Sequence, residues 1–251
     1  MRFVRSFSGL ATAYHRFRPQ YPISAIKYIL EGLGTTIRAA DIGCGTGIST
    51  AMLADLGAYV WAIEPNEEML FEAKRVLTRL TGKVYLCRAI AERTGMQNSF
   101  FNLVVCAQSF HWFDGDLALK EFHRILREEG RLALLWNLKD NDQPFTAAYS
   151  RFLRMVRQDQ EIHNIHGTGQ EFMPTHSRGL FHQLTLDSFP NPHFLDKPSL
   201  IGLALSTSYI PRDRNIQNKI ILDLSKIYDQ YQENGIVTLM YSTNVAIFRA
   251  T

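Results

Sequence analysis

The stretch DIGCGTGIST (residues 41–50) decides the fold of this chain. The run RAADIGC (38–44) leads into it and has the length and apolar character of a buried parallel strand. The segment ISTAMLADLG (48–57) leaves it with helical spacing and ends on a glycine stop signal. Three glycines mark the turn between them: Gly43, Gly45 and Gly47. Glycine is needed where the backbone turns sharply and a ligand approaches it closely, so the stretch predicts a ligand-binding turn.

The spacing of the glycines discriminates among the cofactors that bind such turns. A dinucleotide-binding loop follows G-x-G-x-x-G, but Ile48 stands at the third glycine position. A P-loop needs Gly-Lys-Ser/Thr, and the stretch contains no lysine. Asp41 would repel a pyrophosphate, whereas it would tolerate or attract the ammonium group of S-adenosylmethionine. A plain glycine-rich turn capped by Asp41 is the alternative interpretation.

Glu64 ends the next expected strand, YVWAIEP (59–65), about 20 residues further on. A carboxylate at this position can accept hydrogen bonds from both ribose hydroxyls of an adenosine. The alternative is a surface glutamate that starts a turn before Pro65. Together with the glycine turn, Glu64 favours an adenosine-containing cofactor.

The adenine base is expected near two further places. Ala91 and Glu92 follow the expected strand VYLCRAI (84–90) and would lie at the adenine edge. Met69 lies in the first turn of the helix after Glu64, where it could touch the base or pack in the core. None of these residues suits a phosphate, which agrees with a cofactor that has none.

Strands and helices alternate through the first half of the chain. We expect strands at 38–44, 59–65, 84–90, 101–106 and 131–137, and helices at 48–57, 66–82 and 117–130. This rhythm predicts an α/β fold with a mostly parallel sheet and helices on both faces. Ligands of such sheets bind beyond the carboxyl ends of the strands.

The rhythm breaks after residue 138. We expect a helix at 144–158, a loop at 161–179, an edge strand near 181–189, a helix at 215–232 and a final strand at 237–250. The last two strands would pair antiparallel, with the pieces between them folded as a cap. The chain is therefore divided into an N-terminal lid arm (1–30), a cofactor-binding core (31–137), cap insertions (138–236) and the final strand, all in one domain.

Composition narrows the class further. The 251 residues are 46% hydrophobic and 20% charged, which is ordinary for a globular domain. Neither a long apolar span nor a secretory signal is visible, and three cysteines without metal-ligand spacing indicate reduced thiols, so we expect a cytoplasmic protein without membrane contact. The net charge of +3 is too small to argue for nucleic acid. The residues before Glu31 are basic, which suits an anionic ligand or simply a solvated terminus.

The chain resembles the class I S-adenosylmethionine-dependent methyltransferases of the type 11 kind in five segments: DIGCGTG, AIEPNEEML, RAIAERTG, FFNLVVCAQSFHWFD and FHRILREEGRLAL. AYHRFRPQYP (13–22) and AQSFHWF (107–113) resemble the subgroup related to trans-aconitate methyltransferases, which methylate small organic molecules. The resemblance covers about residues 7–137, with a weaker echo in LSTSYIP (205–211) and the final strand. It implies a Rossmann-like, seven-stranded sheet whose last strand is antiparallel. It also implies S-adenosylmethionine as cofactor and S-adenosylhomocysteine as product.

The site residues follow from the motifs and the resemblance together. We expect the cofactor to contact Tyr14, Arg18, Asp41, Gly43, Cys44, Gly45, Glu64, Pro65, Met69, Ala91, Glu92 and Gln108. Arg18 would pair with the cofactor's carboxylate or with an anionic acceptor, and the tyrosines beside it would close over the site. The alternative for this arm is a basic, partly disordered terminus.

The loop AQSFHWFD (107–114) follows the fourth strand and would line the acceptor. His111 could act as the catalytic base, donate a hydrogen bond to a carboxylate acceptor, or be structural. We expect the acceptor to contact Tyr21, Trp112, Phe113 and Tyr209, with core packing the alternative for these aromatic residues. His163 and His166 lack a matching third ligand, so no metal is expected.

These expectations favour a methyltransferase that acts on an oxygen, carboxylate or hydroxyl, of a small organic molecule, with anionic molecules among the candidates. A tRNA or protein methyltransferase would need a broad basic face, and the Arg and Lys residues of the cap are scattered instead. A non-catalytic protein that binds S-adenosylmethionine is a further alternative. The glycine spacing makes a nicotinamide oxidoreductase the least favoured class.

Overall fold

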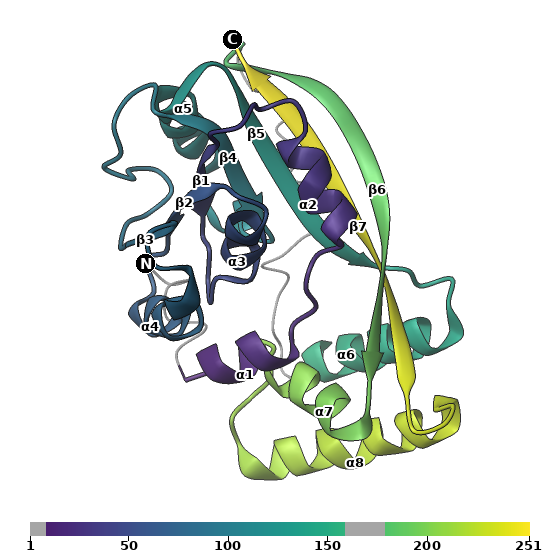
Figure 1. Ribbon diagram of the computed structural model, residues 1–251. Helices are drawn as coiled ribbons and strands as arrows, with labels where there is room; N and C mark the ends of the chain where they lie inside the picture. The colour runs from purple at the N-terminus through teal and green to yellow at the C-terminus, as the bar shows by residue number, and fades with distance from the viewer. Residues whose placement is uncertain (1–8, 159–178) are drawn as a thin grey trace.

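The computed structural model describes residues 9–158 and 179–251 (Figure 1). Seven strands form one sheet in the order β3-β2-β1-β4-β5-β7-β6. The strands are β1 Arg38–Ile42, β2 Tyr59–Ile63, β3 Val84–Cys87, β4 Phe101–Ala107, β5 Leu126–Lys139, β6 Phe181–Leu195 and β7 Val237–Ala250. Strands β1 to β5 pair in parallel, and β7 is antiparallel to both β5 and β6. The predicted Rossmann-like sheet with an antiparallel last strand is confirmed.

Helices cover both faces of the sheet and one of its ends (Figure 1). They are α1 Ala11–Phe17, α2 Ile23–Leu30, α3 Ile48–Asp55, α4 Glu67–Val76, α5 Gly115–Ile125, α6 Pro144–Gln158, α7 Lys197–Leu205 and α8 Arg214–Tyr231. Helices α2 and α3 lie on one face and α5 lies on the other, while α6, α7 and α8 gather where β6 and β7 extend beyond the parallel strands. Within residues 9–158 and 179–251, no helix has both the length and the apolarity to span a bilayer.

Two hydrophobic cores lie on opposite faces of the sheet. In β4, Leu103 and Val105 pack with α2, α3 and α4, whereas Val104 and Cys106 pack with α5. Successive side chains of a strand point to opposite faces, so a strand covered on both sides is apolar at every position. This explains why residues 103–106 of FNLVVC are apolar at every position.

A third core belongs to the cap. It is built from α6, α7, α8 and the ends of β6 and β7 next to them, with Tyr149, Leu200 and Leu224 at most 1% exposed. The expected antiparallel edge pair is present, and β6 runs to Leu195, beyond the predicted 181–189.

Some elements differ from the sequence expectations. Helices α1, α2 and α7 were not predicted, because each has at most nine residues and offers little helical periodicity to detect. The helix expected at 117–130 ends at Ile125. Leu126 already belongs to β5 and pairs with Phe101, and Glu129 adopts a positive φ of 60° where the register of β5 shifts between Leu126 and Arg131.

Helix α1 connects the cofactor-binding half of the sheet with the cap (Figure 1). On one side, Thr12 Oγ1 donates a hydrogen bond to Glu72 of α4 at 3.4 Å. On the other side, Phe17 packs against Gly202 of α7, where a Cβ atom would lie 2.4 Å from the ring. The absence of a side chain at position 202 therefore allows α1 and α7 to touch.

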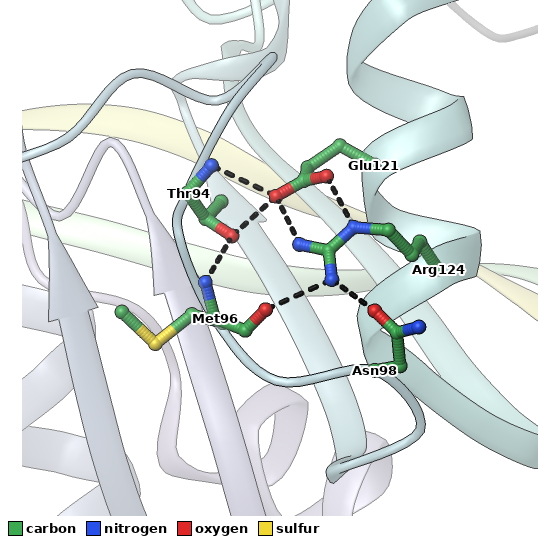
Figure 2. Close-up of polar contacts among 5 residues, drawn as sticks. All are labelled: Thr94, Met96, Asn98, Glu121 and Arg124. Carbon is green, nitrogen blue, oxygen red and sulfur yellow. Dashed lines mark hydrogen bonds and ion pairs between the residues drawn. The ribbon is translucent and has the colours of Figure 1, made fainter.

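Figure 2 shows how the loop between β3 and β4 is fixed to α5. The backbone N–H and the hydroxyl of Thr94 both donate to Glu121, at 2.8 and 2.6 Å. Arg124 pairs with Glu121 at 2.7 Å and also donates to the carbonyl of Met96 at 2.9 Å and to the side chain of Asn98. This network holds in place the loop on which the predicted adenine contacts lie.

Candidate active site

The glycine turn is fastened to the end of β2. The backbone N–H groups of Gly43 and Cys44 donate to the carbonyl of Ile63 at 2.8 and 3.1 Å. Gly45 has a φ of 56°, a left-handed conformation that favours glycine, and a Cβ atom there would meet no atom within 4 Å. The backbone of this turn is therefore held rigidly while one side of it faces open space.

Glu64 is buried directly beside this turn, with 8% of its surface exposed. Its two carboxylate oxygens accept hydrogen bonds from the backbone N–H groups of Gly45, at 3.0 Å, and Asn66, at 2.8 Å. Burial raises the pKa of Glu64, and these two hydrogen bonds oppose the rise. A carboxylate has about four lone-pair sites, so each oxygen keeps capacity to accept from a ribose hydroxyl.

Asp41, at the end of β1, is fully buried. Its Oδ2 accepts hydrogen bonds from the hydroxyls of Ser49, at 2.7 Å, and Thr50, at 2.6 Å. Its Oδ1 is buried and has no hydrogen-bond partner among the described residues. Burial raises the pKa of Asp41 to about 6, against the effect of the two hydroxyls. An unpartnered buried carboxylate oxygen is costly, so the site suits a ligand that brings a cationic donor.

These two carboxylates fit S-adenosylmethionine. The cofactor carries an ammonium group, which suits Asp41, and a ribose diol, which suits Glu64. Gly45, whose backbone N–H donates to Glu64, has open space where a side chain would be. The residues around the turn carry no lysine or arginine of the kind that phosphate-binding loops use.

The loop after β4 folds against the strand ends on both sides. Gln108 has a positive φ of 59°, and its side chain donates to the carbonyl of Asn137 at 3.1 Å. Ser109 Oγ donates to the carbonyl of Ile42 at 2.6 Å. The loop is thus hydrogen-bonded to both β5 and β1, the strands that flank β4.

The aromatic part of this loop faces both the turn and the core. Phe113 lies so near Gly43 that a Cβ atom there would be 3.1 Å from the ring, and Phe113 also packs edge-on against Phe122 of α5. His111 and Trp112 are half-buried in a short 3-10 helix, with ring centroids 5.1 Å apart. The loop therefore lies beside the cofactor turn, and the roles of His111 and Trp112 stay predictions.

The remaining residues expected at the adenine end lie before and within the first turn of α4 and on the loop after β3. Met69 and Ala91 are both 3% exposed, and Pro65 is half-buried. Glu92 accepts a hydrogen bond from the backbone N–H of Asp114 at 2.8 Å, which joins the loops after β3 and β4.

Cys44 is buried in the glycine turn. Burial raises the pKa of its thiol well above the usual value, with the charges of Asp41 and Glu64 adding to the rise. The thiol is therefore protonated at neutral pH and is a poor nucleophile. Only its backbone is suited to contact a cofactor.

The N-terminal arm contacts the glycine turn. The guanidinium of Arg18 lies over the ring of Tyr14, 4.9 Å from the centroid. Tyr21 is 9% exposed, and its pKa is raised well above the usual value by burial, with Asp41 adding to the rise and Arg18 opposing it. Tyr21 thus lies within electrostatic reach of both Asp41 and Arg18.

The arm also supplies a contact that was not predicted. The ring of His15 hydrogen-bonds the hydroxyl of Thr46 in the glycine turn at 3.3 Å. Burial lowers the pKa of His15, so at neutral pH the ring is mainly uncharged. A histidine in the arm motif was the available signal, but sequence spacing does not reveal which loop the arm touches.

The cap contributes Tyr209, which is half-buried beneath the guanidinium of Arg157, 5.6 Å from the ring centroid. Lys139, Tyr149 and Tyr241 lie in the same region and were not predicted. The sequence signal for Lys139 is a charge at the carboxyl end of a buried strand.

The predicted absence of a metal concerned two histidines of the cap. His163 and His166 lie outside the described residues. Within the described residues, no three His, Cys, Asp or Glu side chains gather as metal ligands.

Known proteins share this domain. The methyltransferase domain family matches residues 40–134. An uncharacterized methyltransferase-like protein of Schizosaccharomyces pombe is 28% identical, over 96% of this chain and 93% of its own length. An uncharacterized methyltransferase of Mycobacterium tuberculosis is 36% identical over 54% of this chain, and the match spans about half, 53%, of that relative.

Solved structures share the fold. A "putative type II methyltransferase" from Anaeromyxobacter dehalogenans superposes with a TM-score of 0.66, at 20% identity, over 93% of this chain and 97% of that one. Geranyl diphosphate C-methyltransferase from Streptomyces coelicolor, solved with S-adenosylhomocysteine, superposes with a TM-score of 0.53, at 16% identity, over 91% of this chain and 76% of that one.

Proposed function

Because the chain is a class I S-adenosylmethionine-dependent methyltransferase, we propose that it methylates an oxygen of a small organic molecule. One observation supports this proposal: the arm contacts both the glycine turn and the cap. His15 hydrogen-bonds Thr46 of the turn, and Phe17 packs against Gly202 of α7, so the arm lies across the carboxyl end of β1 and against the cap. Tyr21 of the arm, Tyr149 of α6 and Tyr241 of β7 are each at most 9% exposed. A nucleic acid or a folded protein needs an open face to reach the methyl group, whereas a small acceptor fits an enclosed site.

The proposed cofactor contacts divide by the part of the cofactor they meet. Glu64 binds the ribose, and Asp41 binds the ammonium group. The turn at Gly43, Cys44 and Gly45 contacts the cofactor through its backbone. Pro65, Met69, Ala91 and Glu92 surround the base, and Gln108, Tyr14 and Arg18 close the methionine end. Trp112, Phe113, Tyr21 and Tyr209 line the acceptor. We propose that the arm acts as a lid over this site.

The bound cofactor supplies a methyl group already activated on a sulfonium. The protein's task is to hold the acceptor in line with that methyl group and to exclude water. A carboxylate acceptor is already ionised and needs no base. A hydroxyl acceptor would lose its proton to a nearby group, for which His111 is the candidate.

The variant His111→Ala is expected to lower the turnover number at least tenfold and to change the affinity for S-adenosylmethionine by less than threefold. His111 is assigned to the acceptor, and one hydrogen bond to a charged group is worth at least about 1.5 kcal/mol. Steady-state kinetics and calorimetry measure the two quantities. His123→Ala is the matched control, because His123 is a half-buried histidine of α5 that contacts Phe181 and the carbonyl of Thr251. An unchanged turnover number in His111→Ala would remove this residue from the site.

The affinity for S-adenosylmethionine is expected to fall as the pH drops through about 6. Asp41 has a pKa of about 6 in the ligand-free protein because it is buried, and only its ionised form attracts the cofactor's ammonium group. Below that pH, the dissociation constant should rise about tenfold per pH unit. Glu64, whose pKa is also raised by burial, acts in the same direction. Calorimetry from about pH 4.5 to about pH 8 checks this, and a pH-independent affinity would contradict it.

A screen of acceptors tests the proposed function. The purified protein is incubated with a deuterated-methyl cofactor and panels of small carboxylic acids, phenols and amines, and the products are identified by mass spectrometry. The proposal expects methyl esters or ethers. Products methylated only on nitrogen or carbon would contradict transfer to oxygen.

A further inference from the structure

Lys139 ends β5 directly opposite Tyr241 of β7. Two residues earlier, Asn137 lies opposite Thr243 and accepts a hydrogen bond from its hydroxyl at 2.5 Å. Residues two apart on a strand share a face, so both pairs point to the same side of the sheet. The arm crosses this side, because the amide of Asn137 donates to the carbonyl of Gln20 at 3.3 Å.

The arm is anchored on both sides of Arg18. Before it, the ring Nε2 of His193 donates to the carbonyl of Phe17 at 3.3 Å. After it, Asn191 donates to the carbonyl of Gln20 at 2.8 Å. These strand side chains hold the backbone around Arg18 in one place, on the same side of the sheet as the end of β5.

Positive side chains gather in this region, where Lys139 interacts electrostatically with Arg18 and Arg154. Burial, together with the charges of Arg18 and Arg154, lowers the pKa of Lys139 to about 8. Nε of Arg18 is buried and has no hydrogen-bond partner among the described residues. In the same parts of the chain, no carboxylate forms an ion pair with Lys139 or Arg18. Gathered like charges of this kind are unfavourable until an anion binds.

Two buried tyrosines, Tyr149 and Tyr241, lie within electrostatic reach of Arg18. Burial raises the pKa of Tyr241 to about 12 and that of Tyr149 well above its usual value, and Arg18 opposes both rises. Both phenols are therefore neutral and keep their protons as hydrogen-bond donors. Tyr149 and Tyr241 interact electrostatically with each other and lie in the same cap core. The region offers hydroxyl, ammonium and guanidinium donors, which together suit the oxygens of a carboxylate.

We propose that Lys139 binds a carboxylate of the methyl acceptor, with Arg18, Tyr149 and Tyr241 as its neighbours. This inference rests on the proposed transfer to a small molecule and specifies the class of that molecule. A carboxylate that is ion-paired and hydrogen-bonded has its lone pairs occupied and is a poor nucleophile. The carboxylate at Lys139 is therefore the group by which the acceptor is recognised, and the methyl group goes to a second oxygen of the same molecule. The acceptor class is a small acid with at least two oxygen functions.

Binding and activity are measured separately. Succinate, glutarate, maleate and phthalate, together with their monoamides, are titrated calorimetrically into the protein saturated with S-adenosylhomocysteine. The variants are Lys139→Met, which removes the charge at similar length, and Lys139→Arg, which restores it. Lys120→Met, at an exposed position of α5, is the matched control. Binding of S-adenosylhomocysteine to each variant verifies that it is folded.

We expect Lys139→Met to weaken binding of at least one of these acids about tenfold to 150-fold, the effect of one charged hydrogen bond. Lys139→Arg recovers most of the affinity, and the corresponding monoamide binds wild type and Lys139→Met more nearly alike. Equal binding to Lys139→Met and Lys120→Met across the panel would overturn the inference. Lys139-dependent binding of inorganic phosphate in preference to all the acids would overturn the carboxylate class. Acid binding that depends on Lys139 without any methylated product would instead contradict only the proposed function.

Discussion

Replacing Glu64 with alanine will reduce the affinity for S-adenosylmethionine at least about a hundredfold. The two ribose hydroxyls each donate to the carboxylate in the proposed complex, and a hydrogen bond to a charged group is worth about 1.5–3 kcal/mol. The substitution also removes the acceptor for the N–H groups of Gly45 and Asn66, which loosens the turn itself. Isothermal titration calorimetry on the ligand-free protein measures the loss.

Glu67→Ala is the control for this experiment. Glu67 lies three residues further on, is exposed, and pairs with Arg88 at 3.0 Å. Its loss should change the affinity less than threefold, because an exposed ion pair contributes little. If the Glu64 variant bound the cofactor as well as the Glu67 variant does, Glu64 would have no part in the ribose site.

Replacing Asp41 with asparagine will weaken cofactor binding about tenfold to 150-fold and will stabilise the ligand-free protein. The pKa of Asp41 is raised from 3.8 to about 6 in the fold, so the folded protein binds its proton more tightly than the unfolded chain does. The ionised carboxylate therefore costs stability, of the order of 3 kcal/mol, and this cost appears as the pH rises from 3.8 to about 6. Asparagine has no charge to bury and keeps an oxygen for Ser49 and Thr50.

Thermal unfolding at about pH 7.5, with and without S-adenosylmethionine, separates the effect on stability from the effect on cofactor binding. Without ligand, the Asp41→Asn variant should unfold several degrees higher, at about 2–4 °C per kcal/mol for a domain of this size. With saturating ligand, the wild type should gain more than the variant. A variant that unfolds earlier without ligand and binds the cofactor normally would contradict the assignment of Asp41.

The local part of the site could be predicted from sequence. Asp41, the glycines and Glu64 lie at the ends of consecutive parallel strands, and such ends meet at one edge of the sheet whatever the rest of the chain does. The contact between the loop at Phe113 and Gly43 follows from the same rule, because β4 lies next to β1.

The acceptor side could not be predicted in this way. Lys139, Tyr149 and Tyr241 come from β5, α6 and β7, and they meet because β7 inserts antiparallel between β5 and β6 in one particular register. That register depends on long-range packing and leaves no local pattern in the sequence. The position of Arg18 has the same origin, since side chains of β5 and β6 hold the arm around it.

The central claim is that the methyl acceptor is a small molecule in an enclosed site. The most direct measurement incubates the protein and methyl-labelled S-adenosylmethionine with a cell extract, separates low-molecular-mass from macromolecular fractions, and counts the label in each. We expect the transferred label in the low-molecular-mass fraction, on an acidic compound, and we expect the Glu64→Ala variant to abolish it. Label found in RNA or protein, with none in small molecules, would contradict transfer to a small acceptor.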